Sequence, residues 1–420
     1  MNIYPALYKI RDIGRACTRS ISNRTQLFNY DAFHRPITCI KDDNKNIRLN
    51  LLVMSIEKEA MFGGITTAIK IFKACCDNIG WGGVEARIIT LHTPQNYKHD
   101  LTAGFTLDNE KADHGIFVAE IDGRNVLPVR EHDFFFSSFW VTALLEDKIY
   151  SQQKEFFPNI DIPYFYLAQD YEPAFYAWSS NFIEADASYF TKQKIVAIIN
   201  SKELNDYFFD VLKYRFYDSV YFVPKLNEKL KEYLLKRQNE HGLRKKQILI
   251  YGRPGEARNA FESTINIIRE WSLMLNKEET AEWQIISLGA KHMNIKVHNG
   301  MTILSKGMVS LEKYAEYMLE SYAAISLMVS PHPSYPPLEM STFGVKTITN
   351  TFANKDLSGF NDNLFVIDKF SCEKAANKLY EITSKFNPGM PIIDCDYVMG
   401  QNEFTSVVEL VKKYVIKDKM

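Results

Sequence analysis

Short apolar runs alternate along this chain with longer segments in which apolar residues recur every three or four positions. The first pattern is typical of buried strands, and the second of helices that pack on them. Because the two alternate, the sequence predicts a parallel, doubly wound α/β sheet. The strands predicted for the first half are 48–54, 86–91, 115–119, 133–137, 164–169 and 194–199. Those of the second half are 248–251, 283–288, 301–304, 323–329 and 345–349. The helices predicted between them include 65–78, 141–149, 203–209 and 257–275.

The alternation of strand and helix starts twice, at Ile47 and again near Gln247. A chain of 420 residues is long enough for two domains that each have a core. We place the linker at Val223–Lys225, before a charged helix, Glu228–Glu240. The predicted organisation is a basic extension, two Rossmann-like domains, and an amphipathic C-terminal helix that crosses back to the first domain, at residues 1–46, 47–223, 224–400 and 401–420.

Composition describes an ordinary soluble globular protein, with 46% hydrophobic and 24% charged residues. The formal net charge of −1 argues against a nucleic-acid partner, because no protein-wide basic field is present. The six cysteines form no C-x-x-C pair, which is typical of a reducing compartment. No signal peptide and no apolar run of membrane-spanning length is visible, so a cytoplasmic location is expected.

The first 25 residues are basic, and three of the arginines recur every four positions. On a helix, Arg11, Arg15 and Arg19 would share one side, with apolar residues nearby. Such a segment could lie on the inner, anionic face of the cell membrane as a peripheral contact. A solvated helix packed on the body of the protein explains the pattern equally well.

The most informative segment is Ser326–Asn350, in which an apolar run leads into a proline-rich loop. The pattern predicts a helix that starts at Pro337, carries Glu339 in its first turn and ends at Gly344, with Ser334 as a possible cap. A carboxylate then lies at the carboxyl end of a buried strand, where open α/β sheets bind ligands. A stabilising partner of the helix dipole is the alternative interpretation of Glu339.

Two cations and a glycine pair have the chemistry of a phosphate site. Arg253 follows a predicted strand inside Tyr-Gly-Arg-Pro-Gly, and Lys306 follows another inside Leu-Ser-Lys-Gly. Fixed cations stabilise the charge that develops on a departing phosphate. Gly63 and Gly64 stand where a loop turns into a helix, so that backbone N–H groups could approach an anion. Solvated charges in turns and a purely steric glycine pair are the alternatives.

The first domain offers polar and aromatic residues after the predicted strand 164–169. Carboxylates and amides bind sugar hydroxyls, whereas aromatic rings stack on sugar C–H faces. Asp170 is the candidate general base for an acceptor hydroxyl, although a capping role is nearly as plausible. The other candidate acceptor-binding residues are Gln169, Tyr171, Trp178 and Trp140, the last of which fits a core position equally well.

Together these motifs resemble GT-B glycosyltransferases of the large retaining family 4, which also contains sucrose and glycogen synthases. Within it, Ser330–Glu339 (Ser-Pro-His-Pro-Ser-Tyr-Pro-Pro-Leu-Glu) is most similar to bacterial β-L-rhamnosyltransferases that make rhamnan-type polysaccharides. The resemblance implies two facing Rossmann-like domains with the site in the cleft between them. One departure stands out, because Pro331 occupies the place of a second glutamate, eight positions before Glu339.

The resemblance also implies roles for individual residues. Glu339 would hold the ribose of the nucleotide, and Arg253 and Lys306 would neutralise the departing diphosphate. The remaining nucleotide-sugar contacts would come from Gly63, Gly64, Gly252, Ser334, Tyr335 and Pro336.

The implied reaction transfers L-rhamnose from dTDP-β-L-rhamnose to a growing bacterial surface polysaccharide, with a lipid carrier as one possible anchor of the acceptor. The family retains anomeric configuration and needs no metal or other cofactor, so we set aside the D-x-D spacing of Asp394-Cys395-Asp396. No carboxylate stands out as a covalent nucleophile, which favours departure and attack on the same face. Another hexosyl donor, an epimerase, a phosphorylase and an inactive saccharide-binding module remain open alternatives.

Overall fold

The computed structural model describes residues 37–55, 63–79, 84–92, 116–120, 126–237, 243–389, 396–399 and 404–416. Their tertiary contacts form two compact units. One unit contains the described residues up to Tyr164 together with Phe190–Gln193. The other contains those within Phe165–Tyr189 and Lys194–Lys417. The basic segment 1–25 lies outside the described residues.

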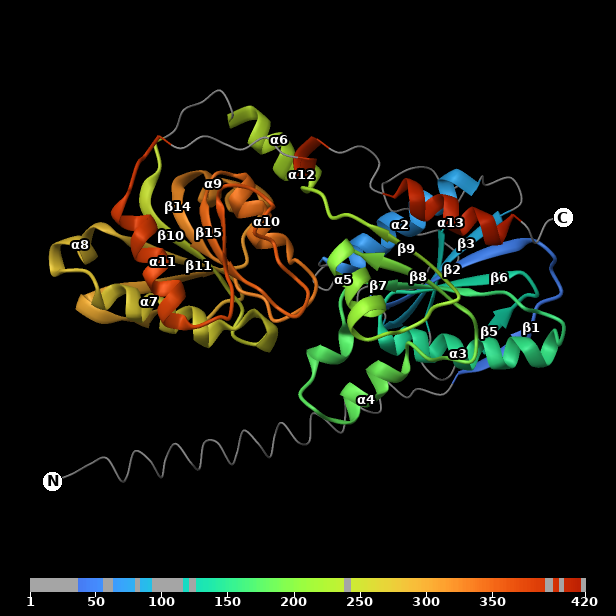
Figure 1. Ribbon diagram of the computed structural model, residues 1–420. Helices are drawn as coiled ribbons and strands as arrows, with labels where there is room; N and C mark the ends of the chain where they lie inside the picture. The colour runs from blue at the N-terminus through green and yellow to red at the C-terminus, as the bar shows by residue number, and fades with distance from the viewer. Residues whose placement is uncertain are drawn as a thin grey trace. The chain divides into compact units, whose positions relative to one another are not determined.

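The first sheet has seven strands in the order β4-β3-β2-β6-β7-β8-β9 (Figure 1). β2 pairs in parallel with β3 and β6, as do β3 with β4 and β8 with β9. The strands are β2 Ile47–Ser55, β3 Val84–His92, β4 Ile116–Glu120, β6 Asp133–Ser137, β7 Tyr164–Ala168, β8 Ile195–Asn200 and β9 Asp218–Phe222. The prediction missed β9, because this edge strand is only half-buried and lacks a continuous apolar run.

The helices of this part follow the predicted order, with shifted ends. α2 begins at Gly64 and α3 continues well beyond the predicted 141–149. The predicted helix 203–209 is a short α-helix that continues as a π-helical turn. The helical elements are α2 Gly64–Ile79, α3 Trp140–Phe156, η2 Glu172–Phe175, α4 Ser180–Ala187, α5 Lys202–Asp206 and η3 Tyr207–Val211. The next helix, α6 (Glu228–Arg237), packs on α9 (Leu311–Glu320) and belongs to the core of the second sheet.

The second sheet also has seven strands, in the order β12-β13-β11-β10-β14-β15-β16. All of its pairings are parallel except that of β12 with β13. The strands are β10 Lys245–Gly252, β11 Gln284–Gly289, β12 Ile295–Lys296, β13 Thr302–Gly307, β14 Ser321–Ile325, β15 Lys346–Asn350 and β16 Leu364–Ile367. β14 is shorter than the predicted 323–329. Beyond Ile325, the side chain of Asn350 bonds both the N–H and the C=O of Met328 and so takes over from the strand ladder.

Helices cover both faces of the second sheet (Figure 1). The helical elements that follow β10 are η4 Ala257–Asn259, α7 Phe261–Leu273, α8 Lys277–Glu282, η5 His298–Gly300, α9 Leu311–Glu320, α10 Tyr335–Thr342, α11 Cys372–Ser384, α12 Asp396–Met399 and α13 Thr405–Val415, the last of which packs on the first sheet instead. The predicted helix 257–275 is interrupted at Ala260, whose φ of 46° lies in the left-handed region. The interruption separates η4 from α7.

Alternation along β10 divides the second core into two layers. Ile248 and Ile250 pack with Trp271 of α7 on one face, and Leu249 packs with Met318 of α9 on the other. This period of two is what a strand buried on both faces requires. The buried indole of Trp271 also donates to the hydroxyl of Thr383, at 3.0 Å, so that its polar atom is satisfied.

The C-terminal helix α13 packs against the edge strand β9. Lys413 and the hydroxyl of Tyr414 both donate to the carboxylate of Asp218, at 2.6 and 2.7 Å. The domain boundaries proposed above stay predictions. Among the helices of the described part of the chain, none is long and apolar enough to span a bilayer.

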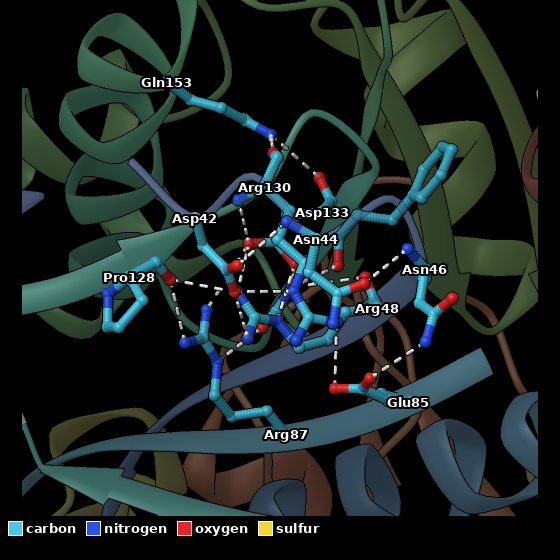
Figure 2. A network of polar contacts seen from close by, with 12 residues as sticks. Asp42, Asn44, Asn46, Arg48, Glu85, Arg87, Pro128, Arg130, Asp133 and Gln153 are labelled. Atoms are coloured by element: carbon cyan, nitrogen blue, oxygen red, sulfur yellow. Dashed lines mark hydrogen bonds and ion pairs between the residues drawn. The ribbon is translucent and has the colours of Figure 1, made fainter. Parts of the chain in front are cut away.

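A buried ionic cluster occupies the amino-terminal ends of β2, β3 and β6 (Figure 2). Asp133 is fully buried, and its carboxylate accepts two bonds of 2.7 Å from Arg48 and one of 3.2 Å from Asn50. The backbone N–H of Arg130 donates to it as well, at 2.9 Å. Arg87 completes the group by donating to Asn50 at 2.7 Å, and burial lowers its pKa to about 9.

The same cluster holds the segment that precedes β2. Strand β1 (Thr38–Lys41) pairs in parallel with β5 (Val126–Val129), and the next residue, Asp42, accepts from Arg130 at 2.7 Å. Residues 38–42, which the sequence assigned to the extension, therefore pack on the first unit.

We predict that Asp133→Ala lowers the free energy of unfolding by about 3–5 kcal/mol, because Arg48 would remain buried with only the more distant Asp42, at 3.8 Å, as a counter-charge. Asp43 is a matched control, since it forms only an exposed ion pair with Lys41, worth at most about 1 kcal/mol. Chemical denaturation of both alanine variants measures the difference. Equal midpoints for the two variants would contradict a stabilising role of the cluster.

Candidate active site

The strand order of the second sheet determines where a ligand can bind. From β10 the chain moves outward through β11 to β13, and it then returns to β14 on the other side of β10. β10 and β14 therefore flank the switch point, and their connections leave toward opposite edges of the sheet. Ligands bind at the carboxyl ends of strands at such a point. Arg253 directly follows β10, and the proline-rich segment follows β14.

The two predicted cations lie at this carboxyl edge. Gly252 pairs with Gly289 on one side of β11, and Gly307 pairs with Leu288 on the other. Since strands are about 4.8 Å apart, the backbones beside the two cations are on the order of 10 Å apart. Lys306 is skipped by the ladder and forms a bulge, rather than following the strand as predicted. A bulge re-aims the side chain that it carries.

Both cations are available to bind an anion. Arg253 has only a half-exposed contact of 3.2 Å with Glu256, a kind of pair that contributes little. Lys306 is exposed, with no ion-pair partner among the residues that the structure describes. Gly252 and Gly289 let the backbones approach, because a Cβ at Gly252 would lie 2.1 Å from the Ser287 hydroxyl and one at Gly289 would lie 2.6 Å from the Gly252 carbonyl oxygen.

Helix α10 begins at Tyr335, two residues before the predicted start at Pro337. Glu339 consequently lies in the second turn, so the prediction of a first-turn carboxylate is wrong. Desolvation raises the pKa of this half-buried residue to about 7, and the nearby Tyr314 hydroxyl lowers it in part. A carboxyl group of this kind exchanges its proton near neutral pH, as ligand-binding carboxylates often do.

Ser334 does not cap α10, in contrast to the prediction. Its φ of 70° is in the left-handed region, so the turn into the helix is strained. The backbone N–H of Ser334 instead donates to Nδ1 of His332, at 3.0 Å. The Tyr335 hydroxyl accepts from Asn200 at 3.0 Å, and Pro336 follows it within the first turn. The side chains of His332 and Asn200 thus hold the turn into α10 in place.

Asp170 joins the loop after β7 to this segment. One carboxylate oxygen accepts from the backbone N–H of Tyr171, at 2.8 Å, and from the hydroxyl of Ser330. The other oxygen forms an ion pair of 2.5 Å with Arg258. With both oxygens engaged and the residue buried, these contacts favour a positioning role over that of a general base.

Sequence reasoning missed Arg258 and Lys355. The Arg258 guanidinium lies 3.9 Å above the Phe175 ring, and it pairs with Asp170 across 88 positions of sequence. Lys355 is fully buried and donates to the carbonyl of Met328 at 2.8 Å. Burial lowers the pKa of Lys355 to about 8. Neither residue lies in a motif, so only the fold reveals these contacts.

The predicted acceptor residues differ in exposure. Trp178 is 95% exposed, and its ring stacks on Phe182 with centroids 5.8 Å apart. Gln169 is half-buried, whereas Tyr171 is buried and its hydroxyl donates to Asp186. Trp140 is fully buried in the core, so it cannot offer its ring to a sugar; the core interpretation holds for this residue.

The glycine pair lies where the prediction placed it. Gly63 has a φ of 40°, and its carbonyl accepts from the N–H and the hydroxyl of Thr67, at 3.0 Å each. Gly64 is the first residue of α2. The amino-terminal end of this helix thus has the geometry of an anion site.

Among the residues that the structure describes, no three or more His, Cys, Asp or Glu side chains are grouped so that they could hold a metal ion. Asp394 and Cys395 lie outside the described residues, as do the details of the Asp396 side chain. The D-x-D spacing is therefore untested.

The fold built from these two parallel sheets is that of the GT-B class. Sucrose-phosphate synthase of Thermosynechococcus elongatus has the same architecture, with a TM-score of 0.59, 9% identity, and 89% of this chain and 99% of that one covered. The catalytic domain of starch synthase IV from Arabidopsis thaliana matches with a TM-score of 0.50, 10% identity and the same two coverages.

The chain belongs to the WsaF family. Residues 48–202 match the WsaF N-terminal domain and residues 246–380 the WsaF C-terminal domain, which together account for most of the sequence. A curated relative is the O-antigen biosynthesis protein RfbC of Myxococcus xanthus, 26% identical over 185 residues. The match spans 44% of this chain but only 14% of that protein.

The raised pKa of Glu339 predicts a specific pH dependence of stability. The unfolded carboxyl titrates near 4.5 and the folded one near 7, so within this window the folded state binds more protons. Stability is therefore lost as the pH rises from about 4.5 to about 7. Glu339→Gln removes this loss, and its stability relative to the wild type should increase across the window and stay constant above it.

Urea unfolding at several pH values measures this difference. Glu312→Gln is a suitable control, because Glu312 is exposed in the first turn of α9. Stability profiles of Glu339→Gln and the wild type that run parallel would show that the Glu339 carboxyl is not desolvated.

Proposed function

We propose that this protein is a glycosyltransferase that transfers L-rhamnose from dTDP-β-L-rhamnose to a growing bacterial surface polysaccharide. The observation that carries the proposal is the pair of a half-buried Arg253 and an exposed Lys306, two cations at the carboxyl edge of one sheet, beside its switch point. Membership of the WsaF family and the relation to an O-antigen biosynthesis protein support a role in polysaccharide assembly.

The reaction that fits these residues breaks the bond between the anomeric carbon and the phosphate oxygen. The acceptor hydroxyl oxygen then bonds to the same carbon, and its proton passes to the departing phosphate. Arg253 and Lys306 stabilise the negative charge that collects on the diphosphate, which is most valuable in the transition state. Because both oxygens of Asp170 are already engaged, the phosphate is the better proton acceptor.

The remaining residues supply binding. Glu339 on α10 suits the ribose hydroxyls, as the family resemblance implies, and the exposed Trp178 ring suits the face of an acceptor sugar. The choice of rhamnose rests on the resemblance of the sequence Ser330–Glu339 to that of rhamnan-type rhamnosyltransferases. The retention of configuration rests on the wider family resemblance. A peripheral membrane contact through residues 1–25 is compatible with a lipid-linked acceptor.

A panel of nucleotide sugars, each incubated with short saccharides and analysed by mass spectrometry, tests the proposal. We expect a product heavier by one deoxyhexose residue, formed only with dTDP-β-L-rhamnose and an acceptor. Conversion of the donor without an acceptor would indicate an epimerase instead. Binding without turnover, for every donor and acceptor offered, would indicate an inactive saccharide-binding module.

Two alanine variants test the cations directly. We predict that Arg253→Ala and Lys306→Ala each lower kcat by about 10²–10³-fold while the fold persists, because each removes a fixed charge that acts on the leaving group. Arg269→Ala and Lys277→Ala remove exposed charges from helices of the same unit and serve as matched controls. Near-normal transfer by both Arg253→Ala and Lys306→Ala would refute the role.

A further inference from the structure

His332 has a fixed tautomer in the loop after β14. Its Nδ1 accepts a hydrogen bond of 3.0 Å from the backbone N–H of Ser334, so Nδ1 carries no proton. Burial lowers the pKa of His332 to about 4, and the ring is therefore neutral at physiological pH. A neutral ring with an unprotonated Nδ1 carries its hydrogen on Nε2. Nε2 is consequently a hydrogen-bond donor.

This donor has no protein partner in the described part of the chain. His332 is 5% exposed, and Nε2 is buried without a hydrogen bond. Leaving such a group unpaired costs about 1–3 kcal/mol, so unpaired buried groups are rare and call for an explanation. A ligand oxygen is the simplest partner at the carboxyl end of a strand beside the switch point.

The loop that carries His332 is rigid, which gives the donor a defined direction. The Ser330 hydroxyl donates to Asp170, and its oxygen accepts from the backbone N–H of His332 at 3.0 Å. Val329 donates to the carbonyl of Arg258 at 2.7 Å. On the other side, the imidazole lies against the Tyr335 ring, with centroids 5.5 Å apart. The chain of contacts from Asp170 to Tyr335 leaves the ring little freedom.

A second unpaired group adjoins the same tyrosine. Asn200, at the end of β8, donates through Nδ2 to the Tyr335 hydroxyl, at 3.0 Å, while its Oδ1 is buried without a partner among the described residues. Two side chains that contact Tyr335 therefore each carry a polar atom that the described residues leave unpaired: the donor Nε2 of His332 and the acceptor Oδ1 of Asn200. A ligand that both accepts and donates hydrogen bonds satisfies the two groups together.

Hydrogen-bonding capacity decides between a sugar and a phosphate. A phosphate only accepts hydrogen bonds, so it would leave Asn200 Oδ1 unpaired. The charged groups that act on His332 are already engaged, because Asp170 and Arg258 pair with each other and Lys355 donates to the carbonyl of Met328. The exposed Lys306 belongs to β13, whereas His332 follows β14, and strands β11 and β10 lie between the two. Neutral hydroxyl groups suit the surroundings of His332 better.

We propose that His332 is a specificity-determining residue whose Nε2–H donates to a hydroxyl oxygen of the transferred sugar, while Asn200 Oδ1 accepts from a hydroxyl of the same ring. This inference rests on the proposed function, since it assumes a nucleotide-sugar donor. It assigns His332 to ground-state and transition-state recognition of the sugar and gives it no part in proton transfer.

Two substitutions separate the two nitrogens of His332. In His332→Asn, the amide oxygen can replace Nδ1 and accept from Ser334, but nothing replaces Nε2. In His332→Gln, the longer side chain places an amide NH₂ near the position of Nε2. His298→Asn is the matched control, because His298 is exposed in η5, away from the carboxyl edge of the sheet.

Isothermal titration with dTDP and with dTDP-β-L-rhamnose provides the readout. We expect His332→Asn to weaken binding of the nucleotide sugar about tenfold, as the loss of one hydrogen bond to a buried donor implies, and to leave dTDP binding unchanged. His332→Gln should recover part of the loss, and His298→Asn should match the wild type for both ligands.

Donor analogues that lack one ring hydroxyl give the same test without any substitution. One such analogue should bind the wild type about tenfold more weakly than the parent sugar, and His332→Asn should not distinguish that analogue from the parent. Equal binding of every deoxy analogue to the wild type would overturn the inference. An equal loss of dTDP and dTDP-β-L-rhamnose affinity in His332→Asn would also overturn it, because the residue would then only shape the nucleotide site.

Failure of the inference is distinguishable from failure of the proposed function. A wild-type protein that transfers rhamnose, together with a His332→Asn variant that binds the donor normally, would refute only the role of His332. A wild-type protein that binds neither dTDP nor dTDP-β-L-rhamnose would refute the proposed function itself.

Discussion

The carboxylate of Asp170 is the contact on which the geometry of the candidate site depends. It anchors the loop after β14 through Ser330, and it holds Arg258, whose backbone carbonyl binds the same loop at Val329. These bonds fix the backbone that leads through His332 to the strained turn at Ser334. Without these bonds the loop would sample many conformations. Ordering each of its residues on ligand binding would then cost about 1–2 kcal/mol of backbone entropy.

Strand order explains why polar groups gather at this place. Where neighbouring connections leave a sheet in opposite directions, the ends of β10 and β14 lack continued ladder partners on their shared side. Asn350 and Lys355 supply substitutes by bonding the backbone of Met328. Backbone groups are then satisfied by side chains, and the edge is left lined with polar atoms suited to a ligand. The cations at Arg253 and Lys306 extend this edge on the other side of β10.

Much of this fold follows from the sequence, because both sheets are buried on both faces. Such strands are continuous apolar runs, as in Leu249-Ile250 or Phe134-Phe136, and they are visible without any alignment. Three of the missed strands lack that signal, since β9 is an edge strand and β1 and β12 are short. The prediction also missed β16, although its four residues are all apolar, because so short a run does not stand out from the surrounding loop. Helix ends were displaced at Ala260, where a left-handed residue breaks the apolar periodicity that predicted one long helix.

The site was predictable only where a motif marked it. Glycines and prolines revealed the strand ends near Arg253 and Glu339, since those residues constrain the backbone locally. Arg258, Lys355 and the tautomer of His332 depend on pairs that are distant in sequence, and no local pattern encodes them. The same reason explains why Asp170 looked like a free base, although its partners lie 88 and 160 positions away.

The most direct test of the account is a crystal structure of the protein with thymidine diphosphate. The account predicts the diphosphate at the carboxyl edge of the second sheet, with its oxygens bonded to the side chains of Arg253 and Lys306. A well-ordered nucleotide bound elsewhere, with both of these side chains still in solvent, would contradict it.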